Sequence, residues 1–254
     1  MSIDIIPAIM PKTFDDLHAR ASEVEGLVPL AQIDIMDGRF VASKSWPYAL
    51  GYPERDEDFL ALSRQEDGLP YWETLDYELD LMIAEPEKHL EEWLPIGASR
   101  IIIHAEAVQD WNALFALDFL NPDARRIGDD IVIALGIAFN PDTDVAQYQE
   151  QIEKFDFVQC MGIAKIGYQG QPYDERVLEQ INRIRSSFPN LPIAVDGGVS
   201  EKTALELVQA GATRLVAGSA IFGADDKEQA IGHLESLVSQ DTFEDAEEDA
   251  PIDE

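Results

Sequence analysis

The chain has 254 residues and a formal net charge of −32 at pH 7. This charge argues against nucleic acids and anionic membranes as partners, because both are themselves negative. No stretch reaches the roughly 18 uninterrupted apolar residues that a membrane helix needs, and the amino terminus lacks the pattern of a signal peptide. The single cysteine, Cys160, cannot form a disulfide within the chain, which favours a reducing, cytoplasmic location.

Short strand-like segments alternate with helical patterns along most of the chain. Strands are predicted at 3–10, 30–36, 77–83, 99–104, 131–139, 155–161, 192–195 and 214–217. Helices are predicted at 14–24, 56–64, 86–94, 109–120, 144–153, 173–188, 200–209 and 221–237. Eight strand–helix units need about 250 residues. The pattern therefore predicts an α/β fold, a single-domain (β/α)8 TIM barrel over residues 1–240.

Two segments depart from this alternation. Residues 37–76 are rich in Pro, Tyr and Trp and are predicted to form a long loop or insertion that contains one helix. A long loop at the carboxyl end of a barrel strand usually forms a wall of the active site. Residues 241–254 contain eight acidic residues and no basic one, which predicts a disordered, solvated tail, with a partner-binding tail as the alternative.

Two similar turns lie near the end of the predicted barrel. Val-Asp-Gly-Gly-Val at 195–199 and Val-Ala-Gly-Ser-Ala-Ile-Phe at 216–222 are apolar strands that run into small residues before a helix. Small residues at a helix start expose backbone N–H groups, which bind anions. The donors would be Gly197, Gly198, Gly218 and Ser219. Turns on the seventh and eighth units of a barrel predict a phosphate site beside Asp196.

Polar residues on the predicted strands are expected at the same mouth of the barrel. Residues 30–36 alternate so that Gln32, Asp34 and Met36 share one face, and 77–83 place Asp80 and Met82 together in the same way. These side chains and that of Asp196 would converge where barrel enzymes have their active sites.

Several motifs together resemble the ribulose-phosphate 3-epimerase family. They lie in order at 7–10, 33–41, 80–86, 104–107, 136–141 and 167–171, followed by the two phosphate turns. The resemblance runs from about residue 3 to residue 224. It implies an epimerase or isomerase of carbohydrate phosphates, in which two aspartates move a proton between the two faces of a ketose carbon and a divalent cation stabilises the enediolate.

The resemblance assigns roles to particular positions. The two catalytic aspartates fall on Asp34 and Asp196. Substrate-lining methionines fall on Met36, Met82 and Met161, and a phosphate-loop glycine falls on Gly170. The implied partner is a phosphorylated sugar, and the chain is a candidate homo-oligomer.

The chain departs from the family at the metal site. The two positions of metal-binding histidines hold Gln32 and Asp80, and a substrate-contacting serine is replaced by Ala8. The remaining tentative ligand set is Gln32, Asp34, Asp80 and Asp196. These oxygen donors favour Mg²⁺, Mn²⁺ or Ca²⁺ over zinc. Without a cation, one of the clustered carboxylates should retain a proton and could donate a hydrogen bond to an enolate.

Alternative functions follow from the same departures. The chain could be a non-catalytic sugar-phosphate-binding relative, since both histidines are absent. It could also be another lyase or isomerase of the phosphate-binding barrel group, such as a hexulose-phosphate synthase, although Asp-Ile-Met-Asp at 34–37 lacks that enzyme's lysine. Lys165 suggests aldolase chemistry, but it is expected in a loop beyond its strand.

Three further residues are given supporting roles. His104 is expected to hydrogen-bond to a neighbour inside the barrel. Asp37 is expected to orient backbone beside Gly38, and Cys160 to be a core thiol facing the helices.

Overall fold

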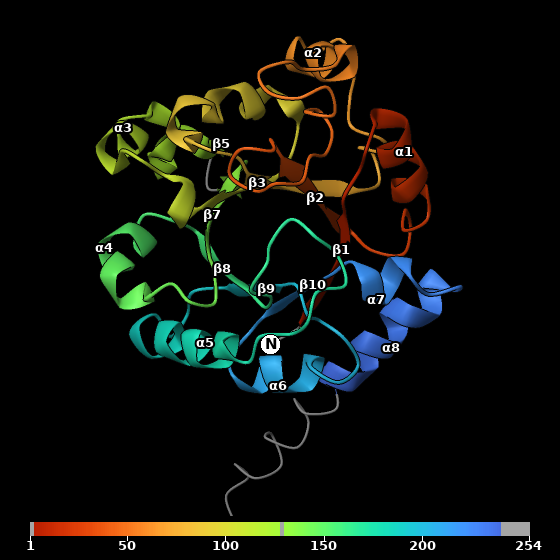
Figure 1. Ribbon diagram of the computed structural model, residues 1–254, viewed down its shortest axis with the longest axis vertical. Coiled ribbons are helices and arrows are strands. Elements are labelled where there is room, and N and C mark those ends of the chain that lie inside the picture. The colour runs from red at the N-terminus through yellow and green to blue at the C-terminus, as the bar shows by residue number, and fades with distance from the viewer. Residues whose placement is uncertain (1–2, 128–129, 240–254) are drawn as a thin grey trace, which may run out of the picture.

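Eight parallel strands close into a barrel with helices around it in the computed structural model, which describes residues 3–127 and 130–239 (Figure 1). The barrel strands are β1 (Asp4–Ile9), β2 (Leu30–Met36), β3 (Asp76–Met82), β4 (Arg100–His104), β7 (Ala134–Phe139), β8 (Phe157–Met161), β9 (Ile193–Asp196) and β10 (Arg214–Ala217). They pair in the order β1-β10-β9-β8-β7-β4-β3-β2. The predicted single-domain (β/α)8 barrel is confirmed. The predicted tail at 241–254 lies outside the described residues.

Strand register places the polar residues inside the barrel. Gln32 pairs with Glu78 across β2 and β3, Asp34 with Asp80 and Met36 with Met82. Residues two apart on a strand point to the same face, so the alternation seen in the sequence becomes a polar column on the inner face. The outer face is apolar and packs against the helices, with Cys160 buried there as predicted.

The described helices are shorter and more broken than the sequence predicts. The α-helices are α1 (Phe14–Ser22), α2 (Glu57–Ser63), α3 (Trp111–Phe115), α4 (Gln149–Ile152), α5 (Arg176–Ser187), α6 (Ala204–Gln209), α7 (Ser219–Phe222) and α8 (Lys227–Ser239). The 3-10 helices are η1 (Pro86–Lys88), η2 (Leu90–Ile96), η3 (Ala105–Ala107), η4 (Asp118–Leu120), η5 (Pro122–Arg125) and η6 (Val145–Tyr148).

Several predicted elements need correction, among them the helices expected at 109–120 and 144–153, which divide into α3 with η4 and into η6 with α4. Two 3-10 helices replace the single helix expected at 86–94, and Pro95 lies inside the second of them, where its missing N–H removes a backbone hydrogen bond. The helix expected at 221–237 is divided into α7 and α8. The fifth barrel strand begins at Ala134 rather than 131, because β5 (Arg126–Ile127) and β6 (Asp130–Ile131) form a separate antiparallel pair.

The segment 37–76 is more ordered than a long loop. It contains α2, and its aromatic residues Trp46, Tyr48 and Phe59 are buried in the main core. The Phe59 and Trp93 rings lie 4.9 Å apart, which fixes α2 against η2. At the mouth of the barrel, its residues Phe40 and Val41 join a cluster with Met36 and Met82.

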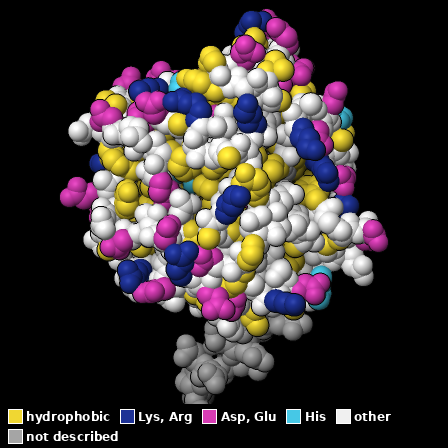
Figure 2. Space-filling model, viewed as in Figure 1, with side chains coloured by type: hydrophobic (Ala, Val, Ile, Leu, Met, Phe, Trp, Pro, Cys, Tyr) yellow, Lys and Arg dark blue, Asp and Glu magenta, His cyan; other side chains and the backbone are white. Residues whose placement is uncertain are grey.

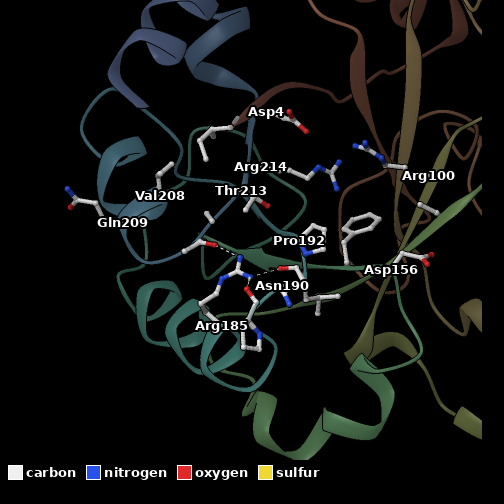
Figure 3. Close-up of a pocket in the computed structure, with 17 residues that line it drawn as sticks. Asp4, Arg100, Asp156, Arg185, Asn190, Pro192, Val208, Gln209, Thr213 and Arg214 are labelled. Carbon is white, nitrogen blue, oxygen red and sulfur yellow. Dashed lines mark hydrogen bonds between the residues drawn. The ribbon is translucent and has the colours of Figure 1, made fainter. Parts of the chain in front are cut away.

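Charged side chains lie at both ends of the barrel. Figure 2, drawn in the same view as Figure 1, shows acidic side chains mostly around the periphery of one face and apolar side chains nearer its centre. Figure 3 shows Arg100 and Arg214 at the opposite end, where β4 and β10 begin. In the part of the chain that the structure describes, no helix combines the length and the apolar character needed to cross a membrane.

Candidate active site

A cavity of about 400 Å³ lies at the carboxyl ends of the barrel strands. The loop from β8 to α5 arches across the centre of the barrel above it (Figure 1). Most of the residues predicted for the site line this cavity: Asp34, Met82, Met161, Gly170, Asp196, Gly197, Gly198, Gly218 and Ser219. Residues far apart in the sequence therefore meet at the expected end of the barrel.

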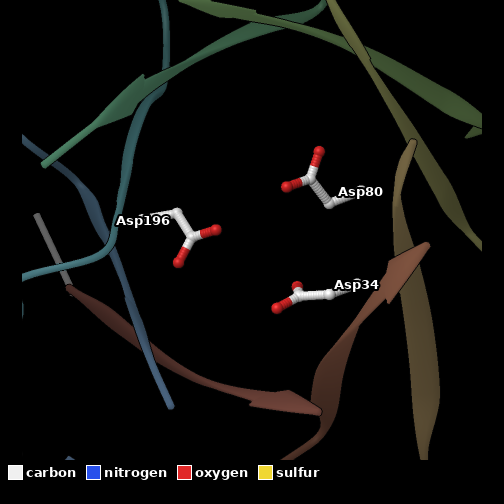
Figure 4. A group of neighbouring side chains, drawn as sticks. All are labelled: Asp34, Asp80 and Asp196. Carbon is white, nitrogen blue, oxygen red and sulfur yellow. The ribbon is translucent and has the colours of Figure 1, made fainter. Parts of the chain in front are cut away.

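Three aspartates from separate strands converge at this end of the barrel, where Asp34 and Asp196 line the cavity and Asp80 is fully buried beside them. Asp34 lies on β2, Asp80 on β3 and Asp196 at the end of β9. One carboxylate oxygen of each lies within 4.8 Å of the other two, and Figure 4 shows the three groups pointing toward one another. All three are buried, with at most 8% of the residue exposed. Ionisation of all three carboxyl groups would be energetically unfavourable, because they lie close together and are shielded from water.

Gln32 links two of these carboxylates. Its Nε2 donates to Asp34 Oδ1 at 2.9 Å and to Asp196 Oδ2 at 3.0 Å. Its Oε1 is buried without a hydrogen-bond partner among the described residues. In this orientation Gln32 is a donor that holds the two carboxylates in place, whereas a metal would need the amide oxygen to face them.

His104 holds the third carboxylate. Its Nε2 lies 2.9 Å from Asp80 Oδ1, and both side chains are fully buried. Burial alone would lower the pKa of His104, but the charge of Asp80 and this hydrogen bond outweigh burial, so the pKa is raised. The predicted hydrogen bond of His104 inside the barrel is confirmed, and its partner is Asp80.

Burial and mutual repulsion hold protons on the aspartates. Burial, followed by the charges of Asp196 and Asp80, raises the pKa of Asp34 well above its usual value. Burial and the charge of Asp80 raise the pKa of Asp196 to about 7. Near neutral pH the two carboxyl groups can therefore hold one proton between them, which gives one acid and one base.

The glycine turns are shaped by close backbone contacts. Gly197 and Gly198 have φ values of 88° and 71°, a region that favours glycine. A Cβ on Gly198 would lie 2.9 Å from the carbonyl oxygen of Gly162. Thr203 Oγ1 donates to the Gly198 carbonyl at 2.7 Å and fixes the turn from the other side. The backbone at this turn is thus held tightly against the β8 loop.

Some cavity residues were not predicted from the sequence. Gln169, Tyr173, Lys202 and Thr203 also line the cavity. Gln169 Nε2 lies 3.4 Å from the Ala8 carbonyl oxygen and close to Gly218, so its amide reaches the glycine turn after β10. Lys202 brings a positive charge near the glycines, and its place just after the first turn was the signal available in the sequence.

Other predicted residues lie beside the cavity rather than on its wall. Met36 is fully buried in the cluster with Val41 and Met82. Lys165 lies in the loop after β8, as expected, with its Nζ 4.3 Å from the centre of the Tyr168 ring. Asp37 accepts from the backbone N–H groups of Arg39, Phe40 and Ala84, which agrees with its predicted role in orienting backbone.

The three aspartates can accommodate a hard divalent cation. Their oxygens lie close enough to share one ion. Asp80 Oδ2 is buried with no hydrogen-bond partner in the described part of the chain, which is the condition of an atom that lacks a ligand. Carboxylate oxygens suit Mg²⁺, Mn²⁺ or Ca²⁺.

A (β/α)8 barrel with buried acids at its mouth and glycine turns on its last two units belongs to the phosphate-binding barrel enzymes. The model of the ribulose-phosphate 3-epimerase family matches residues 64–222, and the chain belongs to that family. The ribulose-phosphate 3-epimerase of Bacillus subtilis is 29% identical over 238 residues, covering 91% of this chain and 98% of the relative. That of Aquifex aeolicus is 28% identical and covers 85% and 87%.

Solved structures agree on the fold. The 3-hexulose-6-phosphate synthase of Salmonella typhimurium superposes with a TM-score of 0.63 at 15% identity, covering 94% of this chain and 99% of the other.

Proposed function

We propose that the protein is an enzyme that inverts carbon 3 of a phosphorylated ketose, with ribulose 5-phosphate as the first substrate to test. Membership of the epimerase family supports this reaction class. The single observation that carries the proposal is the pair Asp34 and Asp196, which share the Gln32 amide at the floor of the cavity.

The pair supplies the two proton transfers that the reaction needs. The ionised carboxylate removes the proton from carbon 3, and the electron pair moves toward the ketone to form an enediolate. The protonated carboxyl group then gives its proton to the opposite face of the same carbon, so the proton count is unchanged. The raised pKa values of both groups support this division of acid and base.

The other residues of the site hold the reactants in place. Backbone N–H groups at Gly197, Gly198 and Gly218 would bind the phosphate, with Ser219 adding its hydroxyl. Gln32 keeps the two carboxylates at a fixed separation, and His104 fixes Asp80. Asp34, Asp80 and Asp196 would hold a divalent cation, which when bound adds positive charge beside the enediolate.

Deuterium exchange tests the proposal directly. The protein is incubated with ribulose 5-phosphate in deuterated water, without metal and with Mg²⁺ or Mn²⁺, and carbon 3 is examined by NMR. Deuterium at carbon 3 is expected. No label under any metal condition, together with measurable binding of the sugar phosphate, would show instead a non-catalytic sugar-phosphate-binding relative.

The proposal extends to the setting of the enzyme. We place it in the cytoplasm, in keeping with its single, buried cysteine. We also propose that residues 1–240 form the barrel and 241–254 an acidic extension, and that barrels associate into a homo-oligomer, which sedimentation at several concentrations would test.

A further inference from the structure

A second cavity, of about 810 Å³, lies at the end of the barrel opposite Asp34, Asp80 and Asp196. It is lined by residues at the starts of strands, including Asp4 of β1, Arg100 of β4 and Arg214 of β10 (Figure 3). Arg185 of α5 also lines it. Three arginines gathered in one cavity are unusual in a chain whose formal charge is −32.

One carboxylate serves two of these arginines. Arg214 Nη2 donates to Glu78 Oε2, and Arg100 Nη1 lies 3.5 Å from the same oxygen. Glu78 is fully buried and Arg214 is 5% exposed. Arg214 Nε and Arg100 Nη1 have no hydrogen-bond partner among the described residues. A single negative charge cannot neutralise two guanidinium groups, and two buried nitrogen atoms lack a hydrogen bond.

The remaining acids leave this excess in place. Asp156 accepts from Arg125 and from the backbone N–H of Leu135, so its charge is already matched. Arg185 donates to the carbonyl oxygens of Pro189, Leu191 and Gly211, none of which carries a formal charge. The cavity and its ion-pair partners contain three acids and four arginines. The acids are Asp4, Glu78 and Asp156, and the arginines are Arg100, Arg125, Arg185 and Arg214. One positive charge therefore remains in excess.

We propose that this cavity binds a small organic anion through a carboxylate or phosphate group held by Arg100 and Arg214. Guanidinium groups bind both anions through paired hydrogen bonds. The Arg214 guanidinium lies 4.6 Å from the centre of the Phe157 ring, and Pro192 and Leu191 add apolar wall. The ligand therefore carries an apolar or carbon-rich body beside its anionic group. The site lies away from Asp34 and Asp196 and is distinct from the proposed substrate site.

Titration of the full chain with inorganic phosphate and with citrate tests the proposal. Backbone amides are followed by NMR, because each of the two sites then has its own reporting residues. The titration is run at low salt. Saturable shifts at Gly211 and Thr213 indicate the arginine cavity, whereas shifts at Gly197 and Gly198 indicate the glycine turns. Citrate is expected to bind the cavity, and added NaCl to weaken the binding.

Arg100→Gln is the informative variant. The Arg100 side chain is 30% exposed, and its loss leaves Glu78 paired with Arg214, so we expect the fold to be retained. Affinity at the cavity should fall about tenfold or more, with the glycine-turn shifts unchanged. Arg183→Gln makes the same charge change on an arginine that is 54% exposed on α5 and should alter neither site.

Two outcomes are decisive. Saturable cavity shifts that are lost in Arg100→Gln support the site. Cavity shifts that are absent, that never saturate or that survive in Arg100→Gln mean an adventitious ion only and overturn the proposal.

Discussion

Asp34 and Asp196 differ in environment from ordinary carboxyl groups because they share a buried amide donor and face a third carboxylate. Gln32 lowers the cost of one negative charge on the pair, while Asp80 raises the cost of two. His104 offsets part of the charge of Asp80. This arrangement can store one proton without a cation, so the loss of imidazole ligands at positions 32 and 80 is compatible with proton transfer.

Asp34→Asn and Asp196→Asn test each half of the pair. An amide can neither take up nor release the proton, so deuterium exchange at carbon 3 should fall by about 100-fold to 10,000-fold in each variant. Calorimetric affinity for the sugar phosphate should change little, because the glycine turns remain. Asp58→Asn, an exposed carboxyl group on α2, serves as the control. Exchange at the normal rate in either variant would exclude that aspartate from the chemistry.

The pH dependence of exchange reports the shared proton. Because the pKa of Asp196 is raised to about 7 and the pKa of Asp34 is also raised well above its usual value, the pair gives up its protons at a higher pH than ordinary carboxyl groups. Without added metal the exchange rate should therefore be low in acid, where both carboxyl groups are protonated, and low in base, where neither is, with the acid-side decline displaced toward neutral pH. Initial rates measured in the presence of a chelator would give the profile. A rate that stays constant through neutral pH would contradict a shared proton.

The sequence predicts the position of single residues well where polar and apolar residues alternate along a strand. Asp34 and Asp80 were placed together because each lies on an alternating strand. The hydrogen bond between Asp80 and His104 was not specified, because it depends on the stagger of β3 and β4. In that register Asp80 pairs with Ile102, so His104 lies two residues further on. Stagger is a property of the closed barrel rather than of either strand.

At the scale of elements, strands were easier to predict than helices. The barrel strands have strong apolar patterns, and their ends shifted by only a few residues. Helices such as α3 and α4 are short, and short helices depend on tertiary packing more than on local propensity. The turn after β9 was predictable because consecutive glycines allow few other conformations.

A comparison of Gly198→Ala with Gly26→Ala separates the effect of backbone strain from that of steric contact at the turn after β9. Both glycines have positive φ, 71° and 78°, so both substitutions should cost about 1–2 kcal/mol of stability. A Cβ at Gly26 meets nothing within 4 Å, whereas one at Gly198 meets Tyr173 and the Gly162 carbonyl. Gly198→Ala alone should move the turn and weaken phosphate binding about tenfold or more. Equal phosphate affinity in both variants would mean that this turn does not bind phosphate.

At the scale of the whole molecule, the acid excess opposes folding through self-repulsion. Fifty acidic residues face eighteen basic ones. Several ion pairs, such as Arg125 with Asp156 and Arg214 with Glu78, are buried, and buried pairs are screened by salt much less than exposed charges. Added salt should therefore remove more repulsion than attraction.

The melting temperature should consequently rise with NaCl at pH 7. The Debye length falls from about 30 Å at 0.01 M to about 3 Å at 1 M, so repulsion between distant carboxylates is lost first. Calorimetry at several salt concentrations would measure the increase. The same series at pH 5, nearer the isoelectric point of about 4.2, should show a smaller increase because fewer carboxylates are charged. A melting temperature that falls with salt at pH 7 would mean that exposed ion pairs, such as Arg183 with Glu179, stabilise the barrel more than the net charge destabilises it.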